Sequence, residues 1–234
     1  MNDDQQRTRR LRTYESDDIA ITYDPRRCIH SAECVRGLRR VFDPDRVPWI
    51  DPEQAEARTI AEVIERCPTG ALHHRRKDGG PSEAPDPENV ARVGPDGPVY
   101  VRGRIRIELP GDDVLDETRV AFCRCGASKD KPFCDGSHEQ AGFRDSGAIQ
   151  GGRLVPLEEL ADGTTDDGEA DPDAGVVTFR GAPNGPLLVR GPLRVEGTDG
   201  SRSTGHKGAL CRCGHSSTRP FCDGSHRDED FEAD

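Results

Sequence analysis

The amino-acid sequence predicts an α+β protein in which a small β-α-β-α-β unit is followed by two small, mainly β modules related by internal duplication. A sixteen-residue stretch occurs twice, as CRCGASKDKPFCDGSH at 123–138 and CRCGHSSTRPFCDGSH at 211–226. Before both copies, apolar residues alternate as in a strand and then recur at helical spacing. Only 32% of the chain is hydrophobic and 33% is charged. Each part therefore has a thin core, of the kind that a bound metal often stabilises.

The N-terminal region is expected to consist of a disordered tail, residues 1–17, and a β-α-β-α-β domain, residues 18–77. The tail is polar and contains clustered arginines. Strands are predicted around 19–23, at Trp49 and Ile50, and from Ala71 to about Arg75. One short helix is predicted to end near Arg40. A second helix is predicted to begin after Asp51 as N-cap and to end at Cys67, with Pro68 as the stop.

The rest of the chain divides by composition and by repetition. A Gly-, Pro- and acid-rich linker at 78–90 precedes module 1, residues 91–150, and an acidic connector at 151–175 precedes module 2, residues 176–234. GPVYVRGRIRIE at 97–108 aligns with GPLLVRGPLRVE at 185–196, at the same 88-residue offset as the two sixteen-residue stretches. Each module is therefore expected to hold a strand pair that bends at Gly103 or Gly191, then a Cys/His loop and a short helix. Between the modules, 154–175 contains eight acids and no Lys or Arg, which predicts a mobile connector.

The repeated stretch orders its side chains as C-x-C-x8-C-x3-H, an order typical of a metal centre. We name residues 123–138 Cys/His loop 1 and residues 211–226 Cys/His loop 2. The last two candidate ligands are four residues apart and so share one face of a helical turn. Asp135 or Asp223 can cap that turn, and Gly136 or Gly224 lets the backbone approach the metal. The candidate ligands are Cys123, Cys125, Cys134 and His138 in loop 1 and Cys211, Cys213, Cys222 and His226 in loop 2.

Both loops resemble the CDGSH (mitoNEET-type) iron-sulfur family. The shared pattern C-x-C-x2-S-x3-P-x-C-D-G-S-H is complete in each copy, with Ser128 and Pro132 in the first and Ser216 and Pro220 in the second. The resemblance implies a [2Fe-2S] cluster bound by three cysteines and one histidine, with two cysteines on one iron and the Cys and His on the other. In that family, two motif-bearing chains often pair through their strands, so a monomer with an internal pseudo-two-fold is expected here.

The N-terminal domain contains three further cysteines, Cys28, Cys34 and Cys67, the last followed by Pro68. Their spacing repeats part of the bacterial ferredoxin run, with Ser31 where the middle cysteine would stand. The segment resembles the divergent 4Fe-4S mono-cluster family over about sixty residues, which implies a ferredoxin-like domain with one cluster. Three thiolates fit a [3Fe-4S] cluster, or a [4Fe-4S] cluster whose fourth iron is bound by His30, Ser31 or water. A second-shell or surface position for His30 is an equal alternative.

Charge and cysteine number limit the partners and the compartment. The formal net charge is -11, and residues 81–234 carry the whole excess of acid. That half should repel nucleic acid. The odd cysteine number, nine, together with the absence of an apolar leader or span, favours a reducing cytoplasm and no membrane association.

Three functions fit these observations. The first is electron transfer to or from a redox partner protein, by two [2Fe-2S] clusters and one [3Fe-4S] or [4Fe-4S] cluster. The second is storage of iron-sulfur clusters and their transfer to apo-acceptor proteins. The third is a zinc-stapled interaction protein without a redox role. No Ser-His-Asp set, phosphate loop or nucleotide fingerprint is recognisable, so the chain is not expected to be an enzyme.

Overall fold

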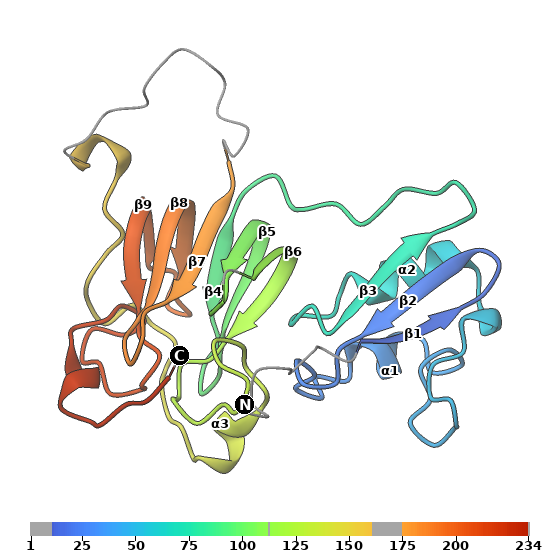
Figure 1. Cartoon of the computed structure of the whole chain (residues 1–234), viewed down its shortest axis with the longest axis horizontal. Coiled ribbons are helices and arrows are strands. Elements are labelled where there is room, and N and C mark those ends of the chain that lie inside the picture. The colour runs from blue at the N-terminus through green and yellow to red at the C-terminus, as the bar shows by residue number, and fades with distance from the viewer. Residues whose placement is uncertain (1–10, 112, 161–174, 234) are drawn as a thin grey trace. The chain divides into compact units, whose positions relative to one another are not determined.

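The computed structural model describes residues 11–111, 113–160 and 175–233 and divides the chain into two compact units, residues 1–83 and 84–234 (Figure 1). Each unit has an apolar core of its own. The chain is a mixed α+β protein with many strands and few, short helices. None of the helices in the described ranges has the length and apolar character that a membrane span needs.

The first unit contains a three-stranded antiparallel sheet with one helix packed against it. The helix α2 (Ala57–Ile64) buries Ile60 and Ile64, and both belong to the same core as Ile19 and Ile21 of the sheet. The spacing of these apolar residues at three to four positions places them on one face of the helix. The sheet order is β1 (Arg12–Glu15), β2 (Ile19–Tyr23), β3 (Leu72–Arg76), and α1 (Glu33–Gly37), η1 (Pro52–Gln54) and α2 connect β2 to β3.

This unit differs from the predicted β-α-β-α-β order. The strands expected around 19–23 and 71–75 are present, but the middle strand expected at Trp49 and Ile50 is not. Instead, Asp43 N–H donates to the Trp49 carbonyl at 2.8 Å, which closes a seven-residue loop, and Ile50 forms only an isolated bridge to Phe42. The third strand is β1, which lies within the predicted disordered tail. Residues 1–10 of that tail lie outside the described residues.

The second helix also begins later than predicted. Asp51 is an N-cap, as expected, and its carboxylate accepts a hydrogen bond from Glu53 N–H at 3.1 Å. The turn that it caps is the 3-10 segment η1, however, and the chain is extended at Ala55 before α2 begins. Cys67 follows the end of α2 and is buried.

The second unit is built from two hairpins that share one sheet. In each hairpin the register shifts at the predicted glycine bend, between Arg102 and Ile105 and between Arg190 and Leu193. A Cβ on Gly103 would lie 2.2 Å from Asn89 Oδ1, so only glycine fits there. The strands are β4 (Val90–Val93), β5 (Val99–Glu108), β6 (Val114–Phe122), β7 (Val177–Gly181), β8 (Leu187–Glu196) and β9 (Arg202–Leu210).

The two modules exchange strand pairings reciprocally. β4 of module 1 pairs in parallel with β8 of module 2, with Val90 opposite Arg194. β7 of module 2 pairs in parallel with β5 of module 1, with Thr178 opposite Arg106. Both pairings are related by the 88-residue offset, so the same contact occurs twice. The modules consequently bury a common core, which includes Phe122 and Phe179 at a ring-centroid distance of 4.7 Å.

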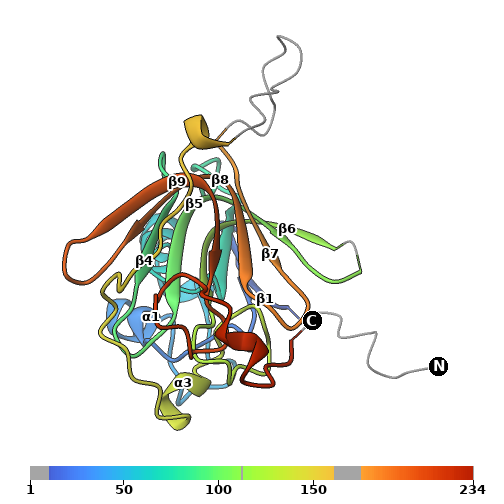
Figure 2. The same cartoon turned by 90° about the vertical axis from the view of Figure 1, so that its left-hand side faces the viewer.

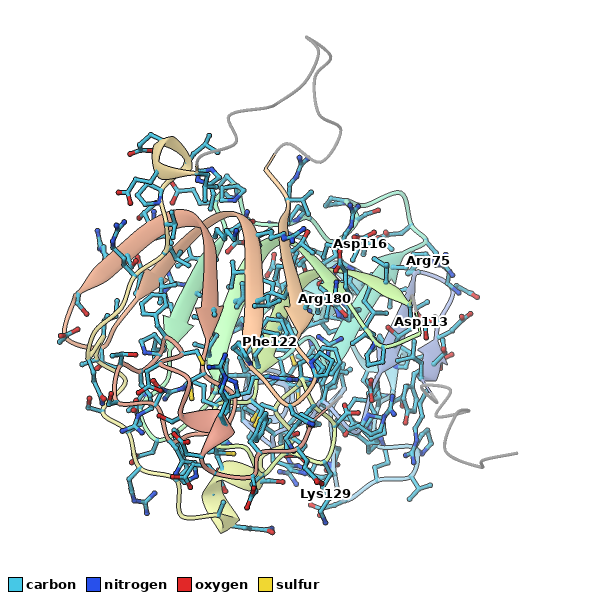
Figure 3. All side chains as sticks on the ribbon, turned by 60° about the vertical axis from the view of Figure 1, so that its left-hand side comes forward. Arg75, Asp113, Asp116, Phe122, Lys129 and Arg180 are labelled. Atoms are coloured by element: carbon cyan, nitrogen blue, oxygen red, sulfur yellow. The ribbon has the colours of Figure 1, made fainter. Side chains whose placement is uncertain are left out.

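Both Cys/His loops lie at the same end of this sheet. In Figure 2 the chain after β9 and the chain around α3 (Ser137–Gln140) gather below the strands. Figure 3 shows Phe122 among the strands, whereas Lys129 lies out on loop 1 and is exposed. The corresponding short helix of module 2 is η3 (Ser225–Arg227).

Part of the predicted connector is packed rather than mobile. Leu154 is buried in the core of the second unit, and Val155 N–H donates to the Lys207 carbonyl at 2.7 Å. Gly205 and Gly208 of β9 make room, because a Cβ on either would lie within 2.7 Å of Leu154. The 3-10 segment η2 (Leu157–Glu159) follows. The remainder, residues 161–174, lies outside the described residues.

Candidate metal centres

Each Cys/His loop places its four candidate ligands in two close pairs. In loop 1 the Sγ atoms of Cys123 and Cys125 are 3.7 Å apart, and Cys134 Sγ lies 3.4 Å from His138 Nδ1. Loop 2 repeats both distances, with 3.7 Å between Cys211 and Cys213 and 3.4 Å between Cys222 and His226. The agreement of the two copies shows that the spacing is a property of the motif.

Backbone hydrogen bonds close each loop and bring the pairs to the same end of a hairpin. Cys123 N–H donates to the Pro132 carbonyl at 2.9 Å, and Cys134 N–H donates to the Ala121 carbonyl at 2.9 Å. Inside the loop, the buried Ser128 hydroxyl donates to the Phe133 carbonyl at 2.7 Å. Ser216 makes the same bond to the Phe221 carbonyl at 2.7 Å. The serine of the motif therefore shapes the loop from within.

The aspartate of the motif joins the loop to the turn that carries histidine. Asp135 accepts hydrogen bonds from Lys129 N–H at 2.9 Å and from Ser137 N–H at 3.0 Å. The predicted cap is displaced by one residue: Asp135 precedes the N-cap of α3, which is Gly136 and has no side-chain cap bond. The next residue, Gly136, has a φ of 89°, and Gly224 in module 2 has a φ of 98°. Side chains other than glycine disfavour this left-handed conformation, so the chain can turn His138 back toward Cys134 only at a glycine.

A buried arginine lies between the first two cysteines of each loop, and its role was not predicted from the sequence. Arg124 donates to the carbonyls of Gly97 at 2.8 Å and Gly94 at 2.6 Å, and its guanidinium lies 5.3 Å from the Phe143 ring centroid. Arg212 repeats this arrangement with the carbonyls of Gly185 and Ala182 and the ring of Phe231. These buried cations fix the C-x-C segment to the turn before β5 or β8.

One thiol of each C-x-C pair ionises more readily than a free cysteine. The hydrogen bond from Cys123 lowers the pKa of Cys125 to about 7, although burial acts in the opposite direction. The bond from Cys213 lowers the pKa of Cys211 to about 6 in the same way. Burial raises the pKa of Cys134 to about 12. Because the thiolate is the form that binds metals, a bound cation is needed to keep Cys134 deprotonated near neutral pH.

The three cysteines of the first unit line one cavity of about 730 Å³. His30 and Ser31, the candidate protein ligands for a fourth iron, also line it, together with the aromatic rings of Tyr23 and Trp49. Burial and the nearby Cys67 and Cys28 raise the pKa of Cys34 to about 11, and Thr69 Oγ1 lies 3.7 Å from Cys67 Sγ. The chain from Cys28 to Cys34 coils back through His30 and Ala32, which have φ values of 56° and 59°.

These donor sets suit metal clusters better than single ions. Among the described residues, no group of three or more His, Cys, Asp and Glu side chains is placed to hold one metal ion. Thiol-rich sites in three places are typical of an iron-sulfur protein.

Comparison with known families assigns each region. The family model described as a divergent 4Fe-4S mono-cluster matches residues 14–77, and the model described as an iron-binding zinc finger of CDGSH type matches residues 96–139 and 184–227. The chain belongs to the CDGSH-type iron-sulfur proteins, with two CDGSH domains and an additional divergent 4Fe-4S mono-cluster domain.

Two curated relatives match part of the chain. The uncharacterized protein YjdI of Escherichia coli K12 and that of Escherichia coli O157:H7 are each 39% identical over 66 residues, which is 28% of this chain and 87% of the relative. No solved structure matches the chain.

Proposed function

We propose that the protein transfers electrons by means of two [2Fe-2S] clusters, each bound by three cysteines and one histidine, and one [3Fe-4S] or [4Fe-4S] cluster. The paired spacing of the donors carries this proposal. Two sulfurs bound tetrahedrally to one metal ion at about 2.3 Å lie about 3.8 Å apart, and a sulfur and an imidazole nitrogen lie about 3.5 Å apart. The observed 3.7 Å and 3.4 Å match both values, so each loop offers two ligands to each of two irons.

The same geometry disfavours a zinc-stapled interaction protein. A structural zinc ion needs four ligands around one centre. Within the described ranges the side chains form pairs, and no set of three is placed around one ion. A two-iron centre needs only a pair at each iron, and each loop offers two such pairs.

Bound clusters supply one-electron oxidation and reduction, and the chain holds and shields them. Cys123 and Cys211 are each 2% exposed, so water has little access to the first thiol of each C-x-C pair. The buried arginines Arg124 and Arg212 support the clusters by fixing the C-x-C segments to backbone carbonyls. All the recognised chemistry lies in the clusters, so we propose that the protein acts with a separate redox partner and is not itself an enzyme.

The composition of the metal sites tests the proposal. Iron, acid-labile sulfide and zinc are measured on protein purified without oxygen, with low-temperature EPR before and after dithionite. About eight irons per chain with equal sulfide would mean two [2Fe-2S] clusters and one [4Fe-4S] cluster. About seven irons with a signal in the oxidised state would mean a [3Fe-4S] cluster. Zinc in place of iron would overturn the proposal.

His30→Ala is expected to leave the N-terminal cluster bound. His30 lines the cavity but is exposed, whereas Cys28 and Cys34 are partly buried and Cys67 is buried. Three thiolates suffice for a [3Fe-4S] cluster, and water can complete a [4Fe-4S] cluster. Iron content and EPR of the variant check this. Loss of the cluster, or of one iron, would identify His30 as a ligand.

The exchanged strands predict a monomer. β4 and β7 already pair with the opposite module of the same chain, so the sheet contact that a second motif-bearing chain would supply is made internally. We propose a monomer, and light scattering should give a mass near 25.6 kDa. A mass of twice that value would contradict the expectation.

Cluster transfer to an apo-acceptor protein is a second candidate function, favoured by one observation. Cys222 and His226 line a cavity of about 610 Å³ at the surface of module 2, and Cys222 is only partly buried. An acceptor thiol could reach this side of the centre. Rapid, stoichiometric transfer of clusters to an apo-ferredoxin would support this function, whereas reversible reduction with all clusters retained would support electron transfer.

A further inference from the structure

Residues 145–152, which we call the strap, leave module 1 and run along Cys/His loop 2. Gln150 N–H donates to the Arg219 carbonyl at 2.7 Å, and Gly151 forms a bridge with Pro220. A Cβ on Gly152 would lie 2.8 Å from Phe221 Cβ, so the strap packs directly on this turn. The turn immediately precedes the candidate ligand Cys222. The strap thus braces loop 2 from the neighbouring module.

Asp145, at the start of the strap, joins the two loops through two arginines. Its side chain is fully buried, and it accepts a hydrogen bond from Arg124 Nη1 at 2.8 Å and another from Arg219 Nε. Gly147 N–H adds a third bond at 2.8 Å. Burial alone would raise the pKa of Asp145, but the bonds from Arg124, Gly147 and Arg219 outweigh it, so the pKa lies below its ordinary value. The buried group is therefore a carboxylate.

Arg219 connects Asp145 to a second point of loop 2. Its Nη1 donates to the carbonyl of Gly214 at 2.8 Å, directly after the ligand Cys213. Gly214 also lies against the other loop, because a Cβ on it would be 3.3 Å from the Cys125 carbonyl oxygen. Through one side chain, Arg219 fixes the part of loop 2 near Cys213 and the part before Cys222.

The residues equivalent to Asp145 and Arg219 in the other module are of different types. At the 88-residue offset, Ala233 stands where module 1 has Asp145, and Lys131 stands where module 2 has Arg219. Lys131 Nζ donates to the Ser128 carbonyl of its own loop at 2.8 Å and lies 5.7 Å from the ring centroid of Phe231. A carboxylate therefore braces loop 2 from module 1, and alanine at 233 offers no such group to loop 1.

We infer that Asp145 is a positioning residue for the second CDGSH centre, that it acts through Arg219, and that it makes the two CDGSH centres unequal. This inference rests on the proposed clusters. If either arginine is removed, the Asp145 carboxylate stays buried with only part of its charge compensated. It then no longer holds the loop in place. Removal of Arg219 should therefore affect the second centre and not the first, because Arg124 keeps its own bonds to Asp145 and to the carbonyls of Gly94 and Gly97.

The test compares Arg219→Met with the matched variant Lys131→Met in the full, cluster-loaded chain. The measured quantity is the rate of loss of [2Fe-2S] absorbance in the presence of an iron chelator. Arg219→Met is expected to create a fast phase, at least about tenfold faster than wild type, that accounts for one of the two centres. Lys131→Met should decay as wild type. Cys222→Ser in the Arg219→Met background should remove the fast phase, which assigns it to module 2.

Two further variants separate positioning from a general loss of folding. Arg219→Lys keeps a cation beside Asp145 but cannot make both bonds of the guanidinium, so its rate should lie between those of wild type and Arg219→Met. Asp145→Asn removes one buried negative charge, so it should also raise the reduction potential of the CDGSH centres, a change that unfolding alone does not produce. Equal decay of Arg219→Met and Lys131→Met, or an unchanged potential in Asp145→Asn, would overturn the inference. A wild-type chain without iron-sulfur clusters would instead overturn the proposed function.

Discussion

Serine in place of Cys134 is expected to remove about two irons and two sulfides from each chain and to leave the other centres loaded. Cys134 Sγ and His138 Nδ1 form one of the two donor pairs of loop 1. Without the thiolate, a single imidazole remains for that iron, which is too few ligands to hold a two-iron centre. Iron and acid-labile sulfide, measured on protein purified without oxygen, check the result.

The second module supplies the matched control. Cys222→Ser should cause the same loss, because Cys222 and His226 repeat the geometry of the first pair. The double variant should lose about four irons and keep only the N-terminal cluster. Loss of about one zinc and no sulfide from either single variant would contradict the two-iron assignment.

The ligand pairs could be predicted from the sequence because they are local. Cys123 and Cys125 are two residues apart, and Cys134 and His138 are four apart, so short-range geometry alone brings each pair together. The contact of Asp135 with this turn was predictable for the same reason, although the N-cap of α3 is Gly136 and not Asp135.

The supporting residues were missed because their partners are distant in the chain. Asp145 is 21 residues from Arg124 and 74 residues from Arg219. One signal was available: an arginine separates the first two cysteines in both copies, as Arg124 and Arg212, and an aromatic residue follows at Phe143 and Phe231. A cation that stands between two candidate metal ligands in both copies suggests a structural contact.

The fold was predictable where hydrophobic pattern and turn chemistry agree. Ile19, Ile21 and Tyr23 alternate, and the predicted strand is present as β2. The pair Trp49 and Ile50 is equally apolar, yet the short turn from Asp43 to Trp49 leaves no length for a strand. Conversely, β1 is polar and mostly exposed, and it becomes a strand only because its backbone pairs with β2. Pairing of such an edge strand is hard to predict from its amino-acid composition.

The pairing of the two modules could be expected only from the repeat. Nothing in the residues of β4 indicates that it lies beside β8, more than 100 positions away, rather than beside β5 alone. The duplication links the two pairings: if β4 of module 1 pairs with β8 of module 2, the equivalent strand β7 is expected to pair with β5.

Cysteine in place of His138 is expected to lower the reduction potential of the first CDGSH centre by on the order of 100 to 300 mV. A neutral imidazole is replaced by a thiolate, so the centre gains a negative charge and accepts an electron less readily. With the histidine, the potential should lie on the order of -400 to 0 mV, between plant-type and Rieske centres. Redox titration followed by EPR measures both values in one chain.

The second centre serves as the internal reference in this experiment. His226 stays in place, so its potential should remain near the wild-type value, and His226→Cys should reverse the pattern. The two loops touch where Gly126 lies against the Cys213 backbone, because a Cβ on Gly126 would be 2.9 Å from the Cys213 carbonyl oxygen. If reduction of one centre strongly affected the other through this contact, the potentials of both centres would shift together. An unchanged potential in both single variants would mean that neither histidine is bound to iron, and the three-cysteine, one-histidine assignment would be wrong.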